Sequence, residues 1–210
     1  MEIFAGIDGT LSYDWINQPG GMATNSHIYD FYRKLNTQGG FKEYFEGPRL
    51  SGGDVQQIVH NVEDYIRTHL KKRPGARVSL FGHSRGGFVA ILVAKRLKGT
   101  CIVHFLGLYD AVDRTSGVDC DTIENVVAAY HAIRDWSRGD RIYFGNTGLK
   151  FAQSVRYTPQ TFWAAHGAIG GDYEKIPSKE SGFKASMDRF QGQAAHSWML
   201  ECARNEGLLV

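Results

Sequence analysis

The chain has 210 residues, of which 42% are hydrophobic and 22% are charged, and its formal net charge is +2 at pH 7. This length suits a single domain, residues 1–210, that can bury a sizeable core. The balanced charge gives no reason to expect nucleic acid as the main partner, and three cysteines without Cys-x-x-Cys or histidine spacing argue against a zinc site and a full disulfide framework.

The N-terminal stretch M-E-I-F-A-G-I-D-G has no basic region followed by a long apolar core, and no apolar stretch approaches the length that spans a membrane. We therefore expect a cytoplasmic protein without a transmembrane segment. Export by a contractile secretion system, which needs no cleavable signal, stays open, as does peripheral contact with a membrane. The sequence does not indicate an oligomeric state.

The first part of the chain predicts a strand, a loop and a helix. Glu2 to Ile7 form an apolar run that ends at the turn Asp8-Gly9-Thr10, which is typical of a core strand. Residues 12–25 are polar and rich in glycine, which favours a surface loop. A short helix is expected over residues 26–36. Its apolar face consists of Ile28, Phe31, Tyr32 and Leu35.

Residues 41–53 place aromatic side chains among glycines and a proline, which predicts a loop. Two of these side chains, Tyr44 and Phe45, could line an acyl pocket and bind substrate, although covering the core is the alternative use. Asp54 then caps a helix that ends at Pro74-Gly75. The apolar residues of this helix follow its 3.6-residue period: Val55, Ile58, Val59, Val62, Ile66 and Leu70.

The stretch R-V-S-L-F-G-H-S-R-G-G at residues 77–87 carries the main functional signal. A short apolar run typical of a buried strand meets a helical pattern at residues 82–86, which fit the G-x-S-x-G nucleophile elbow. Glycine is needed on both sides of Ser84 because the sharp turn brings backbone against backbone. The structural alternative is a glycine-rich turn whose serine caps the helix.

The same turn provides a candidate oxyanion hole. The N–H group of Arg85 lies at a helix N-terminus, where unpaired donors and the helix dipole favour a developing negative charge. If the first strand lies next to the elbow strand, the backbone N–H group of Gly9 or Thr10 supplies a second donor. A strand-ending turn without chemistry is the alternative for these two residues.

The chain after the elbow helix predicts a parallel sheet. Cys101 to Leu108 form a nearly continuous apolar run, which is typical of a central parallel strand. The alternation of strands and helices indicates an α/β fold of the α/β-hydrolase type, with a doubly wound, mostly parallel sheet in three α/β/α layers. Asp110 follows this strand directly, where the chain order Ser, Asp, His requires the acid. Asp113 is a nearby competitor, and a turn or capping role is the alternative for Asp110.

The last third of the chain predicts a helix over residues 122–133, a short strand over residues 141–144 and an aromatic-rich strand end over residues 162–167. That strand end closes on His166, and the glycines around it suit a loop that delivers a histidine over the sheet. A final helix is expected over residues 185–204. The face expected to dock on the sheet consists of Phe190, Ala194, Trp198 and Cys202.

Eight histidines compete for the role of the base. Seven have a position that argues against it: three precede Ser84, one lies inside the elbow, one lies in a predicted strand and two lie on predicted helices. In that order they are His27, His60, His69, His83, His104, His131 and His196. His166 combines a late position with neighbouring glycines, so it is the expected base, with His196 next.

With these residues in place, the sequence resembles the DUF2235 family of α/β-hydrolases, which includes the Tle1 group of type VI secretion phospholipase effectors. The matching pieces, in the family's order, are I-D-G-T at 7–10, T-N-S at 24–26, Y-F-E-G at 44–47, L-F-G-H-S-R-G-G at 80–87, F-L-G-L-Y-D at 105–110, Y-H-A-I-R-D from 130 and W-A-A-H-G-A-I-G-G-D-Y at 163–173. The resemblance implies a serine esterase acting on lipid or other acyl-ester substrates, with Ser84, Asp110 and His166 at the triad positions. The sequence departs from the family at Ala168, where an aspartate is usual, and at Asp172, where a glycine is common.

We therefore expect a serine hydrolase, either an esterase or a lipase with phospholipases included, in which His166 takes the Ser84 proton and Asp110 orients the imidazole. This mechanism needs no metal and no organic cofactor. An acyltransferase with the same triad is one alternative. A catalytically silent binding module that shares the fold is the other.

Overall fold

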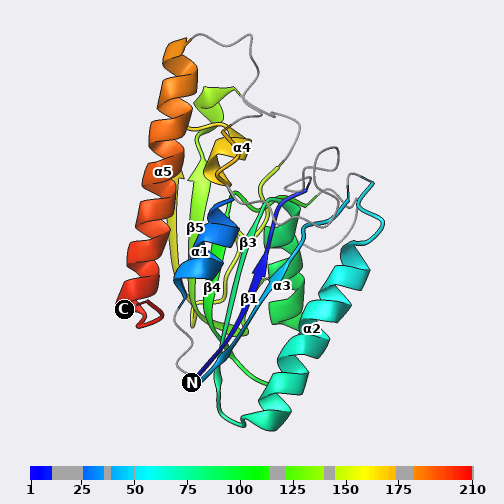
Figure 1. Cartoon of the computed structure of the whole chain (residues 1–210). Coiled ribbons are helices and arrows are strands. Elements are labelled where there is room, and N and C mark those ends of the chain that lie inside the picture. The colour runs from blue at the N-terminus through cyan, green and yellow to red at the C-terminus, as the bar shows by residue number, and fades with distance from the viewer. Residues whose placement is uncertain are drawn as a thin grey trace.

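A computed structural model describes residues 1–10, 26–35, 39–49, 51–113, 122–139, 145–173 and 182–209. The predicted loop over residues 12–25 and the predicted strand over residues 141–144 lie outside the described residues. Within them, a twisted sheet lies between two layers of helices (Figure 1). Cys101 and Cys202 are free thiols.

Six strands form the sheet in the described part of the chain, and every neighbouring pair is parallel. Their order across the sheet is β2-β1-β3-β4-β5-β6. The strands are β1 (Glu2–Ile7), β2 (Phe41–Phe45), β3 (Arg77–His83), β4 (Val103–Tyr109), β5 (Val126–Arg134) and β6 (Arg156–Phe162). This sheet and its helices confirm the predicted doubly wound, three-layer α/β-hydrolase type of fold.

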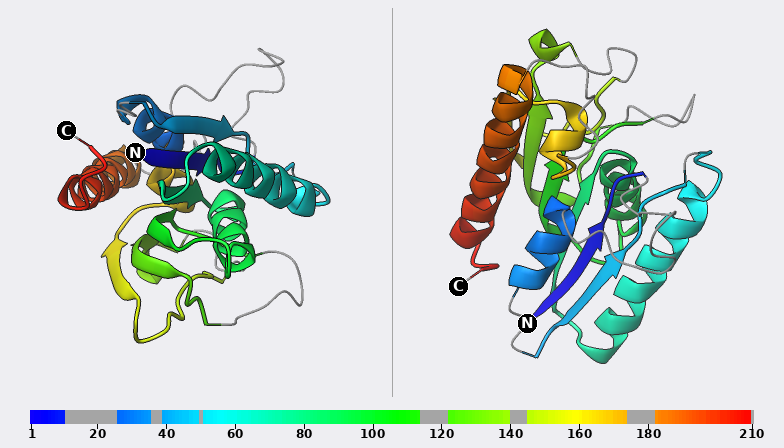
Figure 2. Two further views of the ribbon diagram at one scale, coloured as in Figure 1. Left: turned by 90° about the horizontal axis from the view of Figure 1, so that it is seen from below. Right: turned by 45° about the horizontal axis from the view of Figure 1, so that its top comes forward.

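Helices cover both faces of the sheet (Figure 2). The first face packs against α2 (Val55–Lys72) and α3 (Arg85–Arg96), and its core includes Ile3, Val78, Leu80 and Leu106. The second face carries α1 (His27–Lys34), α4 (His166–Ile169) and α5 (Gly182–Asn205), and its core includes Phe4, Phe81, Phe105 and Met199. A short 3₁₀ helix, η1 (Trp136–Arg138), follows β5. Because the central strands are buried on both faces, they read as continuous apolar runs.

The order of the strands locates the place where a ligand is expected. The chain moves outward from β1 to β2 on one side, and from β3 through β6 on the other. Because β1 and β3 are neighbours, the winding direction reverses between them, and Ile7 lies beside Gly82 near their carboxyl ends. In open α/β sheets, ligands bind in the crevice outside the carboxyl ends of the strands at such a point.

The predicted helix over residues 122–133 is wrong, because Val126–Arg134 form strand β5 between β4 and β6. Several alanines in V-V-A-A-Y-H-A-I-R favour a helix on propensity alone. A strand that is buried on both faces does not alternate between apolar and polar residues. The periodicity of this segment therefore does not distinguish a strand from a helix. Pairing with two neighbouring strands decides in favour of the strand.

Two further predictions need correction. Residues 41–53 were expected to form a loop, but Phe41–Phe45 form the edge strand β2, paired with β1. The C-terminal helix is present, but Phe190 is 63% exposed on it, whereas Ala195, Met199 and Ala203 are fully buried. Small residues face the sheet and α4 because the approach is close: a Cβ atom at Gly192 would lie 2.3 Å from the carbonyl oxygen of Ala168.

Candidate active site

The elbow forms as the sequence predicts. Strand β3 ends at His83, helix α3 begins at Arg85, and Ser84 between them has φ 56° and ψ −127°. A Cβ atom at Gly82 would lie 2.4 Å from the carbonyl oxygen of Gly86, and one at Gly86 would lie 2.2 Å from that of Asp8. Glycine is therefore required on both sides, and the turn holds Ser84 in a strained conformation that other residues rarely adopt.

The structure brings Ser84, His166 and Asp110 together. The Ser84 Oγ atom lies 2.8 Å from His166 Nε2, and the other ring nitrogen, Nδ1, lies 2.6 Å from Asp110 Oδ2. With the Nδ1 proton facing the carboxylate, Nε2 accepts a hydrogen bond from the serine hydroxyl. The three side chains are buried, Ser84 being 8% exposed. This arrangement can activate a serine hydroxyl for attack on a carbonyl carbon.

Asp110 is held in place by more than the histidine. It has φ 43°, and its Oδ1 atom accepts hydrogen bonds from the Arg134 backbone N–H group at 3.1 Å and from Asn146 Nδ2 at 2.6 Å. The Arg134 Nε atom lies 3.5 Å from Oδ2. Burial raises the pKa of Asp110, but the hydrogen bond from His166 and the charges of His166 and Arg134 outweigh it and lower the pKa to about 2. Asp110 is therefore ionised at neutral pH.

Sequence reasoning missed Arg134 and Asn146. Arg134 ends strand β5, which was predicted as a helix, so nothing placed it beside Asp110 at the carboxyl edge of the sheet. Asn146 reaches the same edge through an antiparallel bridge with Val112. A correct assignment of β5 would have found Arg134, because parallel strands end at one edge.

A buried ion pair fixes the segment that carries His166. The Asp188 carboxylate on α5 accepts hydrogen bonds from the backbone N–H of Ala165 at 2.7 Å and from Arg138 Nε at 2.9 Å. Both charged side chains are buried. His83 Nε2 also lies 3.2 Å from the backbone carbonyl oxygen of His166. His166 therefore sits at the start of the short helix α4, between α5 and the elbow, and not on the flexible loop that was expected.

The predicted oxyanion donors lie next to one another at the ends of β1 and β3. The Gly9 N–H group already donates to Asp8 Oδ1 at 2.7 Å. The Arg85 side chain donates from Nε to Thr10 Oγ1 at 2.6 Å, which ties the β1 loop to the elbow. The Gly9 N–H group is therefore engaged within its own loop, and Thr10 stays the candidate for the second donor.

Tyr44 and Phe45 do not lie where a substrate-binding role would place them. The Tyr44 hydroxyl donates to Asp8 Oδ2 at 2.6 Å, and its ring is buried in the core below α1. Phe45 packs on the opposite face of the sheet, edge-on to Tyr65 of α2. Both rings cover the core, which is the alternative use, because they belong to an edge strand and not to a loop.

Three other histidines that were considered as the base occupy different places in the structure. His131 lies on β5, where it accepts from the Ala111 N–H group at 3.1 Å, and burial lowers its pKa to about 4. His196 is buried and contacts Tyr109 and Asp30, so its predicted place off the apolar face is wrong. His104, expected in the core, is partly exposed. None of these three is hydrogen-bonded to Ser84.

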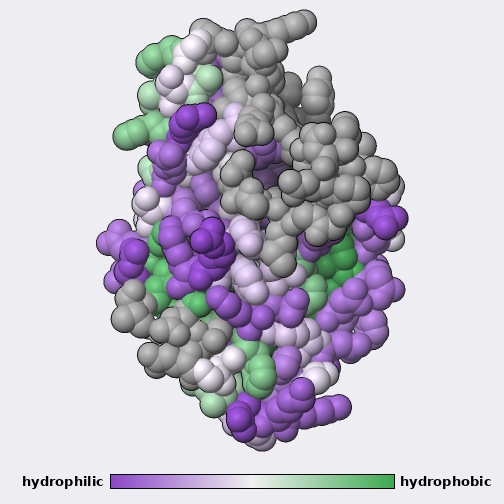
Figure 3. Space-filling view, viewed as in Figure 1, coloured by the Kyte–Doolittle hydropathy of each residue, from purple (hydrophilic) through white to green (hydrophobic). Residues whose placement is uncertain are grey.

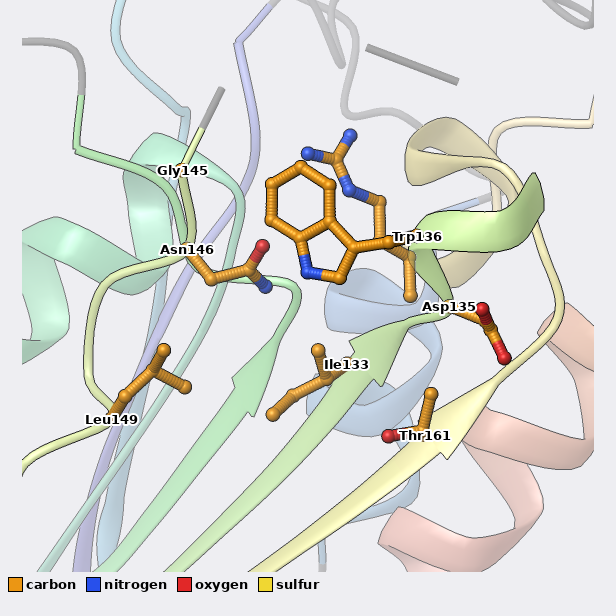
Figure 4. Close-up of a pocket in the computed structure, with 8 residues that line it drawn as sticks. Ile133, Asp135, Trp136, Gly145, Asn146, Leu149 and Thr161 are labelled. Carbon is orange, nitrogen blue, oxygen red and sulfur yellow. The ribbon is translucent and has the colours of Figure 1, made fainter. Parts of the chain in front are cut away.

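A pocket of about 520 Å³ opens at the carboxyl ends of β5 and β6 (Figure 4). Its lining combines apolar side chains with a few polar ones: Ile133, Arg134, Asp135, Trp136, Gly145, Asn146, Leu149 and Thr161. Among the residues that the structure describes, no group of three or more His, Cys, Asp or Glu side chains could hold a metal ion. None of the described helices is long and apolar enough to cross a membrane.

Comparison with known proteins adds one family match and one curated relative. The family model described as lipase (class 3) matches residues 6–105, which run from β1 into β4 and contain Ser84 but neither Asp110 nor His166. Human monoglyceride lipase is 38% identical over 63 residues, which are 30% of this chain and 20% of that protein.

The solved structures that are similar in fold have low sequence identity to this chain. A cutinase-like protein from a Cryptococcus species is 16% identical, with a TM-score of 0.48 and coverage of 98% of this chain and 94% of that one. A putative hydrolase of the α/β superfamily from Xanthomonas campestris is 14% identical, with a TM-score of 0.48 and coverage of 97% and 98%. An uncharacterized protein from Pseudomonas aeruginosa is 14% identical, with a TM-score of 0.47, and the chain covers 46% of its length.

Proposed function

We propose that this chain is an ester hydrolase of the lipase type, which cleaves acyl esters with Ser84 as nucleophile, His166 as base and Asp110 as the acid that orients the histidine. The observation that carries the proposal is the buried hydrogen-bonded series from Ser84 through His166 to Asp110. It lies at the carboxyl edge of the sheet, with the elbow at the point where the winding direction reverses. The class 3 lipase match supports it, since that match includes the elbow and the β1 loop.

In the first half of the reaction, Ser84 Oγ attacks the ester carbonyl carbon while His166 Nε2 takes the hydroxyl proton. The ionised Asp110 keeps the other ring proton on Nδ1 and stabilises the imidazolium that forms. His166 then gives its proton to the oxygen of the leaving alcohol, and the acyl group stays on Ser84.

The oxygen of the tetrahedral intermediate is stabilised by the backbone N–H groups of Arg85 and Thr10. Arg85 opens α3, so its N–H group lies at the positive end of the helix dipole, where a developing negative charge is favoured. The hydrogen bond from Arg85 Nε to Thr10 Oγ1 joins the two residues that would supply these donors. Water then attacks the acyl-enzyme with His166 again as base, which releases the acid.

The finer identity of the substrate rests on resemblance. We propose that the chain is related to the DUF2235 hydrolases and acts on lipid esters, phospholipids among them, since the motifs at residues 7–10, 80–87 and 163–173 carry the site described above. The monoglyceride lipase segment also supports a lipid ester. A cytoplasmic location and a single domain over residues 1–210 stay predictions.

Labelling with a fluorophosphonate, followed by peptide mapping, tests the nucleophile directly. We expect the wild-type protein to be labelled at Ser84 and to hydrolyse nitrophenyl butyrate, and Ser84→Ala to lose both while keeping its circular dichroism spectrum and melting temperature. Folded wild-type protein that is neither labelled nor active would favour the silent binding module. Activity retained by Ser84→Ala would rule the mechanism out.

A further inference from the structure

The pocket at the ends of β5 and β6 begins one side chain away from the triad. Two of its lining residues, Arg134 and Asn146, hold the Asp110 carboxylate through the contacts described above. Asp110 in turn contacts His166. Arg134 and Asn146 therefore lie between the pocket and the acid of the triad, on the side of the triad away from β1.

The lining of this pocket suits a ligand that is mostly apolar. Ile133 and Leu149 supply aliphatic surface and Trp136 an indole ring, and their side chains face a common space in Figure 4. Trp136 is 52% exposed and Leu149 is 49% exposed, which places two large apolar side chains at the mouth of a concave site. Apolar walls with a few convergent polar groups are typical of small-molecule sites.

One buried polar atom in the lining, Asn146 Oδ1, lacks a hydrogen-bond donor in the described part of the chain. The Asn146 Nδ2 atom donates to Asp110, and this bond fixes which way the carboxamide points. Its Oδ1 atom is buried and has no hydrogen-bond partner among the described residues. A buried acceptor without a donor is unfavourable. A hydroxyl or N–H group of a ligand in the pocket would supply the missing hydrogen bond to Asn146 Oδ1.

The mechanism decides which half of an ester can reach this pocket. The carbonyl oxygen must point to the N–H groups of Thr10 and Arg85, at the ends of β1 and β3. The leaving oxygen must instead lie beside His166 Nε2, which protonates it. The alcohol that extends from that oxygen therefore starts on the side of His166 and Asp110, and the pocket lies beyond them.

We propose that this pocket binds the alcohol half of the ester, and that it favours alcohols that combine an apolar chain with a second hydroxyl group, which donates to Asn146 Oδ1. The proposal rests on the proposed esterase function. It defines the substrate class as esters of amphiphilic diols or polyols.

The same pocket would position an alcohol for the reverse step. An alcohol bound there attacks the acyl carbon of the acyl-enzyme, His166 takes its proton, the bond between that carbon and Ser84 Oγ breaks, and Ser84 recovers the proton from His166. The products are a new ester and free enzyme, so atoms and protons balance. Alcohols that fit the pocket should therefore compete with water for the acyl group.

Butyrate esters with different alcohols test the proposal. We expect kcat/KM for the primary monoester of hexane-1,2-diol to exceed that for hexyl butyrate at least tenfold. Only the diol ester carries a hydroxyl group that can donate a hydrogen bond to Asn146 Oδ1. The kcat/KM value for hexyl butyrate should exceed that for ethyl butyrate by up to about fourfold for each methylene group that the pocket buries. Leu149→Trp, which fills the mouth of the pocket, should reduce the ratio of hexyl to ethyl ester at least tenfold.

Ile102→Trp is the matched control, because Ile102 is 54% exposed just before β4, at the amino-terminal edge of the sheet. It should leave both ratios unchanged. Product analysis should also show more butyryl transfer to added hexane-1,2-diol than to ethanol, and less in Leu149→Trp. Equal kcat/KM values for the diol ester and hexyl butyrate would overturn the proposal. The proposal would also be overturned if Leu149→Trp changed the preference for acyl-chain length and left the preference for the alcohol unchanged.

Failure of the proposal and failure of the proposed function give different results. Fluorophosphonate labelling of Ser84 reports the function in every variant. If the wild-type protein is not labelled, the alcohol site is measured in Ser84→Ala by calorimetry with hexane-1,2-diol. Binding that Leu149→Trp abolishes and Ile102→Trp retains supports the pocket, and no binding in either protein overturns it.

Discussion

Ser84 and Asp110 are the non-glycine residues with positive φ in the described part of the chain, at 56° and 43°. Such conformations cost about 1–3 kcal/mol each and persist only where the surroundings enforce them. The Ser84 N–H group donates to the carbonyl oxygen of Tyr109 at 3.0 Å, and the Asp110 N–H group to that of Ala132 at 2.7 Å. Among the described residues, the positive φ angles outside glycine thus fall on two of the three proposed triad residues, whose side chains both contact His166.

Asp110→Asn tests the role of Asp110 in orienting His166, because the variant leaves Ser84 and His166 in place. An amide in place of the carboxylate no longer holds the proton on Nδ1 and cannot stabilise the imidazolium, so we expect kcat to fall roughly 10³-fold to 10⁴-fold. Steady-state hydrolysis of nitrophenyl butyrate measures the change. Asp113→Asn, at the neighbouring acid considered from sequence, is the control and should retain activity. A loss of less than tenfold in Asp110→Asn would contradict the assigned role.

Asp8 gives the protein a pH-dependent stability. Burial is the largest effect on this carboxyl and, against the hydrogen bonds from Ser26, Tyr44 and Gly9, it raises the pKa from 3.8 to about 6. The folded protein therefore binds this proton more tightly than the unfolded chain. The stability that results is fully present below pH 3.8 and is lost as the pH rises through about 6. The difference amounts to roughly 3 kcal/mol.

Asp8→Asn, which mimics the neutral carboxyl, should remove this component. We expect the free energy of unfolding of the wild-type protein, measured in urea, to fall between pH 4 and pH 7 by more than that of the variant. Asp64→Asn, at an exposed carboxyl on α2, is the control and should follow the wild-type curve. Parallel curves for the wild type and Asp8→Asn would show that Asp8 does not bind its proton as described.

At the scale of elements, α4 depends on α5 more than on its own length. Four residues cannot form a stable helix alone. Ala165 N–H is bound by Asp188, and the Gly192 backbone packs against Ala168, so α5 fixes both ends of the segment that carries His166. The position of the histidine is therefore a property of the packing between α4 and α5.

Asp188→Ala should destabilise the whole protein, because it leaves the buried Arg138 guanidinium without its carboxylate and Ala165 N–H without its acceptor. We expect a loss of roughly 3–5 kcal/mol in the free energy of unfolding. Glu124→Ala, which removes the exposed partner of Lys98, is the matched control and should cost less than about 1 kcal/mol. Equal losses in the two variants would indicate that the Arg138 pair does not clamp α4.

The elements with a strong period were predictable from sequence, and β5 was not. Helix α2 keeps its apolar residues in step with its turns, and β3 and β4 are short, mostly apolar runs. Strand β5 is apolar on both faces and rich in alanine, so its identity depends on pairing with β4 and β6, which a local pattern does not contain.

At the scale of the whole molecule, the site is assembled from residues that local patterns identify only in part. The elbow was predictable because its glycines and its serine are adjacent in sequence, and Asp110 and His166 because chain order restricts them. Arg134, Arg138, Asn146 and Asp188 were not predictable. Arg134 and Asn146 contact Asp110, whereas Arg138 and Asp188 hold the backbone of Ala165 beside His166. These contacts join distant elements, and none of the four residues carries a sequence motif.

Two exposed aromatic side chains lie near the carboxyl edge of the sheet. Phe183 and Phe190 lie on the first turns of α5 and are 71% and 63% exposed. Figure 3 shows hydrophobic side chains gathered at the upper left, over the start of α5. Asp188 joins this part of α5 to the segment that carries His166, so the exposed rings and the site share one edge.

If the chain is the proposed esterase and works at a lipid surface, replacing these rings with charges should slow the hydrolysis of aggregated substrates alone. Burying a phenylalanine ring contributes about 1.5–3 kcal/mol, so the double variant Phe183→Asp/Phe190→Asp should hydrolyse a tributyrin emulsion at least tenfold more slowly. Its kcat/KM for monomeric ethyl butyrate should match the wild type, because neither ring lines the pocket or contacts the triad. Ile102→Asp adds a charge at an apolar position that is 54% exposed on the opposite edge of the sheet, and it should slow neither reaction. Equal emulsion rates in the two variants would leave the α5 rings without a role at the interface, whereas a selective loss would place the lipid surface over the edge that holds Ser84.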